Sequence, residues 1–158
     1  MNTCVESHSV EETIELGRKL AALLRTGDVV VLTGDLGAGK THLTKGIALG
    51  LGITDEITSP TFNILRLHEG RTADGDDVEL AHWDIYRLED PSQLDDVDYF
   101  GMLESGCISI VEWGDKFPDD MPDDYLQVDI SLDAEGVRRL AFSAHGPRGE
   151  EMAAAMAG

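Results

Sequence analysis

In the first third of the chain, apolar residues follow a helical period and then a strand-like run. Behind Ser9 they recur every three or four positions as far as Leu24, which predicts an amphipathic helix. Ser9 and Glu12 form a capping box at its start, and Gly27 is expected to end it as a left-handed cap. Residues 29–33 are a continuous β-branched run, typical of a strand buried on both faces.

The same two patterns continue along the chain. A glycine-rich turn leads into a second helix, expected from about Lys40 to Leu51 and closed by Gly52. Strand, turn and helix in this order open a βαβ unit. Later strands are expected at 61–67, 78–86, 108–113, 126–132 and 137–143, with hairpin turns at 70–77 and 133–136 and a weakly helical acidic stretch at 87–106. The alternation predicts an α/β fold that ends in a hairpin.

Length and composition limit the possible organisation. A chain of 158 residues, 42% of them hydrophobic, supports one packed domain, expected over residues 1–145. Residues 146–158 contain Gly and Pro before an Ala-rich run, and are expected to form a flexible C-terminal tail. The two cysteines, Cys4 and Cys107, form no disulfide or zinc pattern and fit a reducing compartment. Without a signal-peptide pattern or a long apolar run, a cytoplasmic protein without membrane contact is expected.

The charge balance excludes one class of function. The chain has 12 Lys and Arg residues against 31 Asp and Glu residues, a formal net charge of -19. Phosphate contacts require clustered basic side chains, so the chain is not expected to bind bare nucleic acid directly. A function that involves RNA would therefore require a more basic partner that binds the RNA. We interpret the acidity itself as a solvated surface.

Residues 34–41 form the strongest motif. They read Gly-Asp-Leu-Gly-Ala-Gly-Lys-Thr and match G-x-x-x-x-G-K-[ST] between an expected strand and an expected helix. Backbone N–H groups of such a loop surround phosphates, Lys40 would reach the β- and γ-phosphates, and Thr41 would offer its hydroxyl to Mg²⁺. The predicted nucleotide-binding residues here are Asp35, Leu36, Gly37, Ala38, Gly39, Lys40, Thr41 and His42. No N/T-K-x-D element for guanine is found, so ATP is favoured over GTP.

A carboxylate is needed beside such a loop to complete a metal site. Glu112 ends the apolar run 108–111 and is the candidate, either as a ligand or water-mediated partner of Mg²⁺ or as the group that orients the attacking water. Trp113 follows it and either forms a wall of the site or belongs to the core.

Two further residues are candidates for the hydrolysis step. Asp84 lies in an otherwise apolar strand end, where an unpaired carboxylate would be unfavourable. It is expected to position water or the metal shell, or else to pair with Arg66 or Arg87. Thr61, in the polar turn 59–62, would lie where a switch segment contacts the γ-phosphate. Whether Asp84 or Glu112 orients the water stays open.

Four sequence blocks in order resemble a known family. They are the loop at 34–41, Ser-Pro-Thr-Phe at 59–62, His-Trp-Asp-Ile-Tyr-Arg-Leu at 82–88 and Val-Glu-Trp at 111–113. The first is generic, but the other three with this spacing are specific. The chain resembles the bacterial tRNA threonylcarbamoyladenosine biosynthesis ATPase family (TsaE, formerly YjeE) over roughly residues 5 to 145. The resemblance implies a three-layer P-loop NTPase-like domain with a mixed, largely parallel sheet.

The resemblance also implies an activity and its residues. Family members bind ATP and Mg²⁺, hydrolyse ATP slowly alone, and work with the threonylcarbamoyl transferase and its non-catalytic paralogue, which modify adenosine 37 of tRNA. By this resemblance Lys40 holds phosphate, Thr41 and Glu112 serve the metal, Asp84 is linked to hydrolysis, and Thr61 lies in the switch-like segment.

Two residues are assigned to the nucleotide with less support from motifs. By resemblance, a residue before the first helix, Ser7 or Ser9, and Arg138 in the last hairpin would touch the nucleotide. His42 departs from the family pattern, which usually has a small hydroxyl residue there. It is not expected to abolish binding.

Two other functions share the loop. A small P-loop kinase would transfer the γ-phosphoryl group to a metabolite, but no arginine-bearing lid is evident in the sequence. A nucleotide-sensing module would bind ATP tightly and hydrolyse none, even with its partners present.

Overall fold

The computed structural model describes residues 2–34, 39–54, 65–85, 88–90, 92–96, 98–113 and 117–157. Along the chain these residues form β1 (Asn2–Ser7), α1 (Val10–Ala21), β2 (Val29–Gly34), α2 (Lys40–Gly50), β3 (Leu65–Arg71), β4 (Asp77–Asp84), α3 (Ser92–Asp96), α4 (Tyr99–Glu104), β5 (Ile108–Glu112), a short 3-10 helix η2 (Pro118–Asp120), β6 (Tyr125–Leu132), β7 (Arg138–His145) and α5 (Gly146–Ala157).

The strands form one sheet of seven in the order β1-β7-β6-β2-β5-β4-β3. The four central strands, β6, β2, β5 and β4, run parallel to one another. Antiparallel strands complete both edges, β3 on one side and the β7–β1 pair on the other. The predicted α/β class and the largely parallel sheet with a C-terminal hairpin are therefore confirmed.

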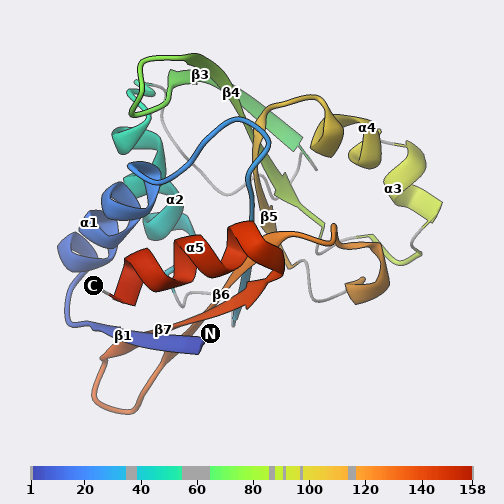
Figure 1. The fold of residues 1–158 in the computed structure, drawn as a ribbon. Helices are drawn as coiled ribbons and strands as arrows, with labels where there is room; N and C mark the ends of the chain where they lie inside the picture. Colours follow the sequence, from blue (N-terminus) through green and yellow to red (C-terminus); the bar gives the residue numbers. More distant parts are fainter. Residues whose placement is uncertain are drawn as a thin grey trace.

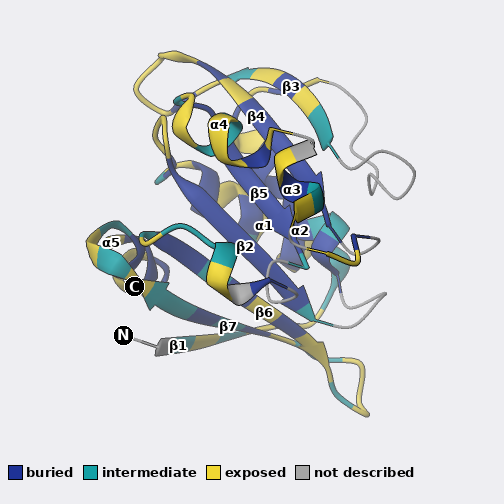
Figure 2. Cartoon of the chain, turned by 90° about the vertical axis from the view of Figure 1, so that its right-hand side faces the viewer, coloured by how far each residue is buried: buried dark blue, intermediate teal, exposed yellow. Residues whose placement is uncertain are grey.

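Helices cover both faces of the sheet, so its central strands are buried on both sides (Figures 1 and 2). On β2, Val30 and Leu32 belong to the core beneath α1, α2 and α5, whereas Val29 and Val31 belong to the core beneath α3 and α4. This two-sided burial explains the continuous apolar run at 29–33, since neither face of the strand meets water.

The first helix begins as predicted and ends earlier. The Ser9 hydroxyl accepts a hydrogen bond from the Glu12 N–H at 3.1 Å, and the Glu12 carboxylate accepts one from the His8 N–H at 2.6 Å. Helix α1 ends at Ala21 rather than at Gly27. Gly27 does adopt a positive φ of 89°, but in the turn that enters β2. The apolar period extends past the helix because Leu24 is still buried in the core.

Two segments at the ends of the chain differ from expectation. Strand β1 was not predicted, and it joins the sheet by pairing with β7. The expected flexible tail from residue 146 is wrong: Gly146–Ala157 is helix α5, with Met152, Ala153 and Met156 buried against the sheet. Helix α5 is ordered by tertiary contacts, which the composition of this segment does not reveal.

The remaining expectations agree in type and shift in their bounds. The predicted strand at 61–67 corresponds to β3, Leu65–Arg71, and residues 61–64 lie outside the described residues. The acidic stretch contains the short helices α3 and α4. At the hairpin turn 133–136, the Asp133 carboxylate accepts hydrogen bonds from the N–H groups of Glu135 and Val137. Within the described residues, no helix is both long enough and apolar enough to cross a membrane.

Candidate nucleotide-binding site

The junction between β2 and α2 lies at the centre of the sheet. Strand β2 ends at Gly34 with a φ of 127°, and α2 begins after Gly39, whose φ is 115°. Both values lie in the region that glycine tolerates best, which explains the two glycines that bracket the loop. Gly39 caps α2 without a side-chain hydrogen bond, so the N–H groups of the first turn and the helix dipole favour an anion there.

A hydrogen bond and a cation–π contact hold Lys40 at this junction. Its side chain is buried, and Nζ donates a hydrogen bond to the Gly34 carbonyl at 2.6 Å. The same ammonium lies 3.8 Å from the centre of the Trp113 ring, a cation–π contact. Trp113 also packs against the core beneath α3 and α4, so it serves both as a wall of the junction and as core. A strained φ of 68° turns its backbone after β5.

The two candidate carboxylates lie side by side at the ends of adjacent strands. The parallel register of β4 and β5 places Asp84 opposite Glu112, and both are buried, 8% and 2% exposed. Leu80 lies four residues before Asp84 on β4, and Ile110 lies two residues before Glu112 on β5. Both belong to the core beneath α1 and α2. Because side chains alternate along a strand, Asp84 and Glu112 belong to the face that α2 covers.

A buried histidine contacts one of these carboxylates. His82 precedes Asp84 by two residues, so both side chains project from the same face of β4. Its Nε2 lies 2.6 Å from Oε2 of Glu112. In the sequence, His82 appears only as the first residue of the block at 82–88 and was not a candidate site residue. Its spacing of two from Asp84 is the sequence signal for the shared face, whereas the contact with Glu112 depends on the register of β4 and β5.

Strands β1 and β7 bring together Ser7 and Arg138, the two residues that were assigned to the nucleotide with less support from motifs. The register of β1 and β7 sets Ser7 opposite Arg138. The Ser7 hydroxyl lies 2.7 Å from that of Thr13 in α1. A Cβ built on Gly39 would meet Arg138 Nε at 3.0 Å, so the arginine lies directly beside the start of α2. Ser7 is buried, and sequence reasoning missed Thr13 as its partner.

The first turn of α2 presents Thr41 and His42, both half-buried. Partial burial, aided by the positive charges of Lys45 and Arg138, holds the pKa of His42 below its usual value. In the described structure, Nδ1 of His42 is buried without a hydrogen-bond partner. The lowered pKa favours the neutral form of the imidazole beside the predicted phosphate site.

Part of the predicted site lies outside the described residues, namely Asp35, Leu36, Gly37, Ala38 and Thr61. The other predicted residues are Ser7, Gly39, Lys40, Thr41, His42, Asp84, Glu112 and Arg138. Those at the start of α2 and at the ends of β4 and β5 lie at the carboxyl edge of the parallel strands, where open α/β sheets bind ligands. Within the described ranges, no group of three or more His, Cys, Asp or Glu side chains forms a metal site by itself.

Comparison with known proteins assigns the family. The model of the family described as "Threonylcarbamoyl adenosine biosynthesis protein TsaE" matches residues 7–140. The chain belongs to the TsaE family. The tRNA threonylcarbamoyladenosine biosynthesis protein TsaE of Streptomyces coelicolor is 42% identical over 139 residues, which cover 85% of this chain and 91% of that protein. TsaE of Treponema pallidum is 37% identical and covers 89% and 98%, respectively.

A solved structure agrees with this membership. The crystal structure of Bacillus subtilis YdiB superposes with a TM-score of 0.79 at 31% identity, covering 99% of this chain and 94% of that one. The fold is therefore the P-loop NTPase-like fold that the resemblance to the TsaE family implied. The relatives are named for tRNA threonylcarbamoyladenosine biosynthesis.

Proposed function

We propose that this protein binds ATP with Mg²⁺ at the β2–α2 junction and hydrolyses it as the ATPase component of tRNA N6-threonylcarbamoyladenosine modification. One observation carries the proposal. The buried Lys40 begins α2 at the sheet edge where Asp84 and Glu112 end adjacent parallel strands. A cation for phosphate and carboxylates for the metal or water are the parts that ATP hydrolysis requires on this fold.

Each residue of the junction has a proposed role toward the nucleotide. The N–H groups of residues 35–39 and of the first turn of α2 bind phosphate oxygens. Lys40 exchanges its bond with the Gly34 carbonyl for one with the β- and γ-phosphates. Arg138, beside Gly39, adds a second positive charge. Ser7 and His42 line the nucleotide from β1 and α2, and Thr61 contacts the γ-phosphate.

The available side chains fit a magnesium ion. Mg²⁺ prefers oxygen ligands and is usually held by one or two side chains together with phosphates and water. Thr41 and Glu112 supply a hydroxyl and a carboxylate of this kind. When bound, the ion neutralises charge on the phosphates. We assign the orientation of the attacking water to Asp84, which is buried opposite Glu112.

The proposed partners are the threonylcarbamoyl transferase and its non-catalytic paralogue, with ATP hydrolysis resetting the complex between turnovers. The net charge of -19 agrees with docking on proteins rather than on tRNA, which the chain would meet only through the complex. This role places the protein in the cytoplasm.

The proposal is tested by measuring ATP hydrolysis by the purified chain, alone and with both partner proteins, with Lys40→Ala as the control. We expect slow hydrolysis alone, stimulation by the partners, and none by the variant. Fast hydrolysis that the partners do not change would contradict the proposed role, as would ATP binding without hydrolysis in their presence.

A further inference from the structure

The hydrogen bond between His82 and Glu112 joins two side chains that are shielded from water. The imidazole is 0% exposed and the carboxylate 3% exposed, and their atoms Nε2 and Oε2 lie 2.6 Å apart. An ionised carboxylate only accepts hydrogen bonds, so Nε2 donates. Such a bond to a charged acceptor is short and strongly directional.

Packing alone does not explain a histidine at this position. In the described structure, the other ring nitrogen of His82, Nδ1, is buried without a hydrogen-bond partner. A buried polar atom without a partner destabilises the folded state, and an aromatic hydrocarbon ring of the same shape would avoid that penalty. The bond to Glu112 is therefore the property that distinguishes histidine from phenylalanine here.

We propose that His82 is a positioning residue for Glu112: it fixes the carboxylate so that Oε1 faces the metal and water at the β2–α2 junction. The inference rests on the proposed function. His82 lies opposite Ile110, two residues before Glu112, so the ring reaches forward across the strand pair to Oε2. With Oε2 held by the histidine, Oε1 is the oxygen that meets a ligand. Partners of this kind, which orient a metal-binding carboxylate, change metal affinity and activity by about 10- to 100-fold.

The test compares His82→Phe with His82→Gln. Phenylalanine keeps a ring and removes the donor, whereas the glutamine amide keeps an N–H donor at a similar reach. The readouts are the Mn²⁺ affinity of the ADP-bound protein by electron paramagnetic resonance, the ATP affinity without metal, and kcat. We expect His82→Phe to weaken Mn²⁺ binding and kcat about tenfold, with metal-free ATP affinity unchanged within about twofold, and His82→Gln to restore most of the loss.

A double variant separates positioning from a structural role. In a Glu112→Gln background, adding His82→Phe should produce no further loss of Mn²⁺ affinity, because the carboxylate it would orient is gone. If His82→Phe does not fold, His82→Asn replaces it, since asparagine is too short to reach Glu112. Wild-type Mn²⁺ affinity in the donor-free variant would overturn the positioning role alone. Absence of nucleotide-dependent Mn²⁺ binding in the wild-type protein would overturn it together with the proposed function.

Discussion

At the scale of single residues, Lys40 and Glu112 show how the site is prepared. Lys40 is aligned by the Gly34 carbonyl on one side and by the Trp113 ring on the other. Glu112 is aligned by His82. Both charged groups are buried, and both are held by partners that restrict their side-chain rotamers. Ordering them in advance reduces the entropy lost when a ligand is bound.

Sequence reasoning predicts part of this arrangement. Lys40 and Thr41 follow from the loop motif, and Glu112 from a carboxylate that closes an apolar strand. The contact between His82 and Glu112 could not be predicted, because it depends on the register between β4 and β5, which are separated by two short helices.

Glu112→Gln removes the negative charge and preserves the shape of the side chain. We expect ATP hydrolysis to fall about 100-fold, because the proposed metal ligand and its charge are lost, while ATP affinity changes much less. Single-turnover hydrolysis and ATP titration measure the two quantities separately. If affinity fell as far as the rate, the metal-side role of Glu112 would be wrong.

At the scale of elements, helices α1 and α2 pack with their backbones in direct contact. The two helices cross at glycines: a Cβ on Gly46 would meet the Ile14 carbonyl carbon and the Gly17 Cα at 2.8 and 2.9 Å. Backbones that approach this closely leave no room for a side chain. Both glycines lie inside helices, where the backbone conformation does not require glycine. The requirement for a residue without a side chain becomes visible only when the two helices are packed together.

Gly46→Ala should therefore destabilise the fold. Overpacking at a backbone contact lowers the free energy of unfolding by roughly 1–3 kcal/mol, and the better helix propensity of alanine offsets about 1 kcal/mol of this loss. Leu49→Ala on the same helix, at a side chain 53% exposed, is the matched control and should change stability little. Equal urea midpoints for the two variants would show that the α1–α2 contact is looser than described.

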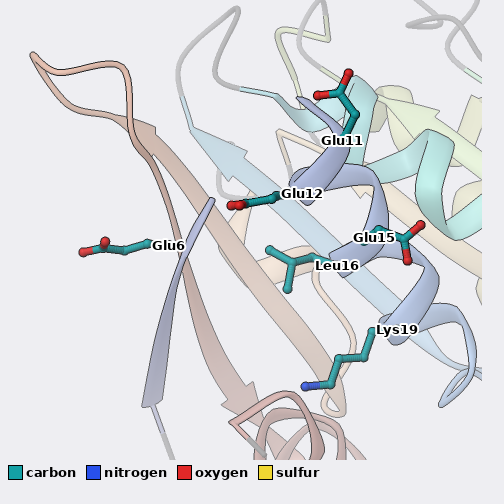
Figure 3. A pocket seen from close by; sticks show the side chains of 6 residues that line it. All are labelled: Glu6, Glu11, Glu12, Glu15, Leu16 and Lys19. Atoms are coloured by element: carbon teal, nitrogen blue, oxygen red, sulfur yellow. The ribbon is translucent and has the colours of Figure 1, made fainter. Parts of the chain in front are cut away.

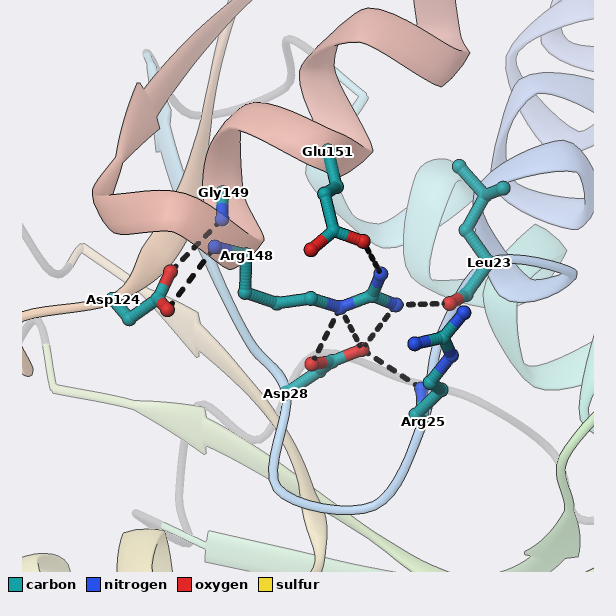
Figure 4. Close-up of polar contacts among 7 residues, drawn as sticks. All are labelled: Leu23, Arg25, Asp28, Asp124, Arg148, Gly149 and Glu151. Atoms are coloured by element: carbon teal, nitrogen blue, oxygen red, sulfur yellow. Dashed lines mark hydrogen bonds and ion pairs between the residues drawn. The ribbon is translucent and has the colours of Figure 1, made fainter.

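Helix α5 is fixed at its first turn by a group of polar contacts (Figure 4). The Arg148 guanidinium donates to both oxygens of Asp28, with Nη2 to Oδ2 at 2.8 Å, and to the Leu23 carbonyl. The Asp124 carboxylate accepts hydrogen bonds from the N–H groups of Arg148 and Gly149. The Asp28 carboxylate raises the pKa of Arg148 above its usual value. These partners come from distant positions, which is why composition alone suggested a flexible tail.

Arg148→Met tests this anchor. Removing the guanidinium leaves the Asp28 carboxylate, which is 7% exposed, without its main counter-charge, and we expect a loss of roughly 2 to 3 kcal/mol in the free energy of unfolding. Glu151→Gln is the control, since that carboxylate is 63% exposed and its pairing contributes little. Chemical denaturation followed by circular dichroism compares the variants. Equal stability of both would contradict an anchoring role for Arg148.

At the scale of the whole molecule, the candidate site lies at the ends of the parallel strands, and antiparallel strands extend the sheet at both edges. The order of the central strands agrees with the predicted class, whereas the edge position of β1 could not be predicted, because its pairing with β7 spans almost the entire chain.

Acidic side chains gather near the edge of the sheet that β1 forms. Glu6, Glu11, Glu12 and Glu15 line a surface pocket of about 530 Å³ with Leu16 and Lys19 (Figure 3).

The net charge of -19 predicts a salt effect on stability. Like charges repel more strongly in the compact state than in the unfolded chain, and dissolved ions screen that repulsion. We expect Tm to rise by several degrees between about 0.05 M and about 0.5 M KCl, where the screening length falls from roughly 14 Å to roughly 4 Å. A Tm that stays constant or falls across this range would show that attractive pairs compensate the repulsion.

We propose that the β2–α2 junction binds the phosphates of ATP through Lys40. Calorimetric titration of ATP with Mg²⁺ into the wild-type protein and into Lys40→Ala tests it most directly, with circular dichroism to confirm that both are folded. We predict saturable binding to the wild-type protein and a loss of at least about tenfold in affinity for the variant, since a buried charge-assisted hydrogen bond to phosphate is removed. Equal affinity of the two folded proteins for ATP would show that Lys40 does not hold the phosphates.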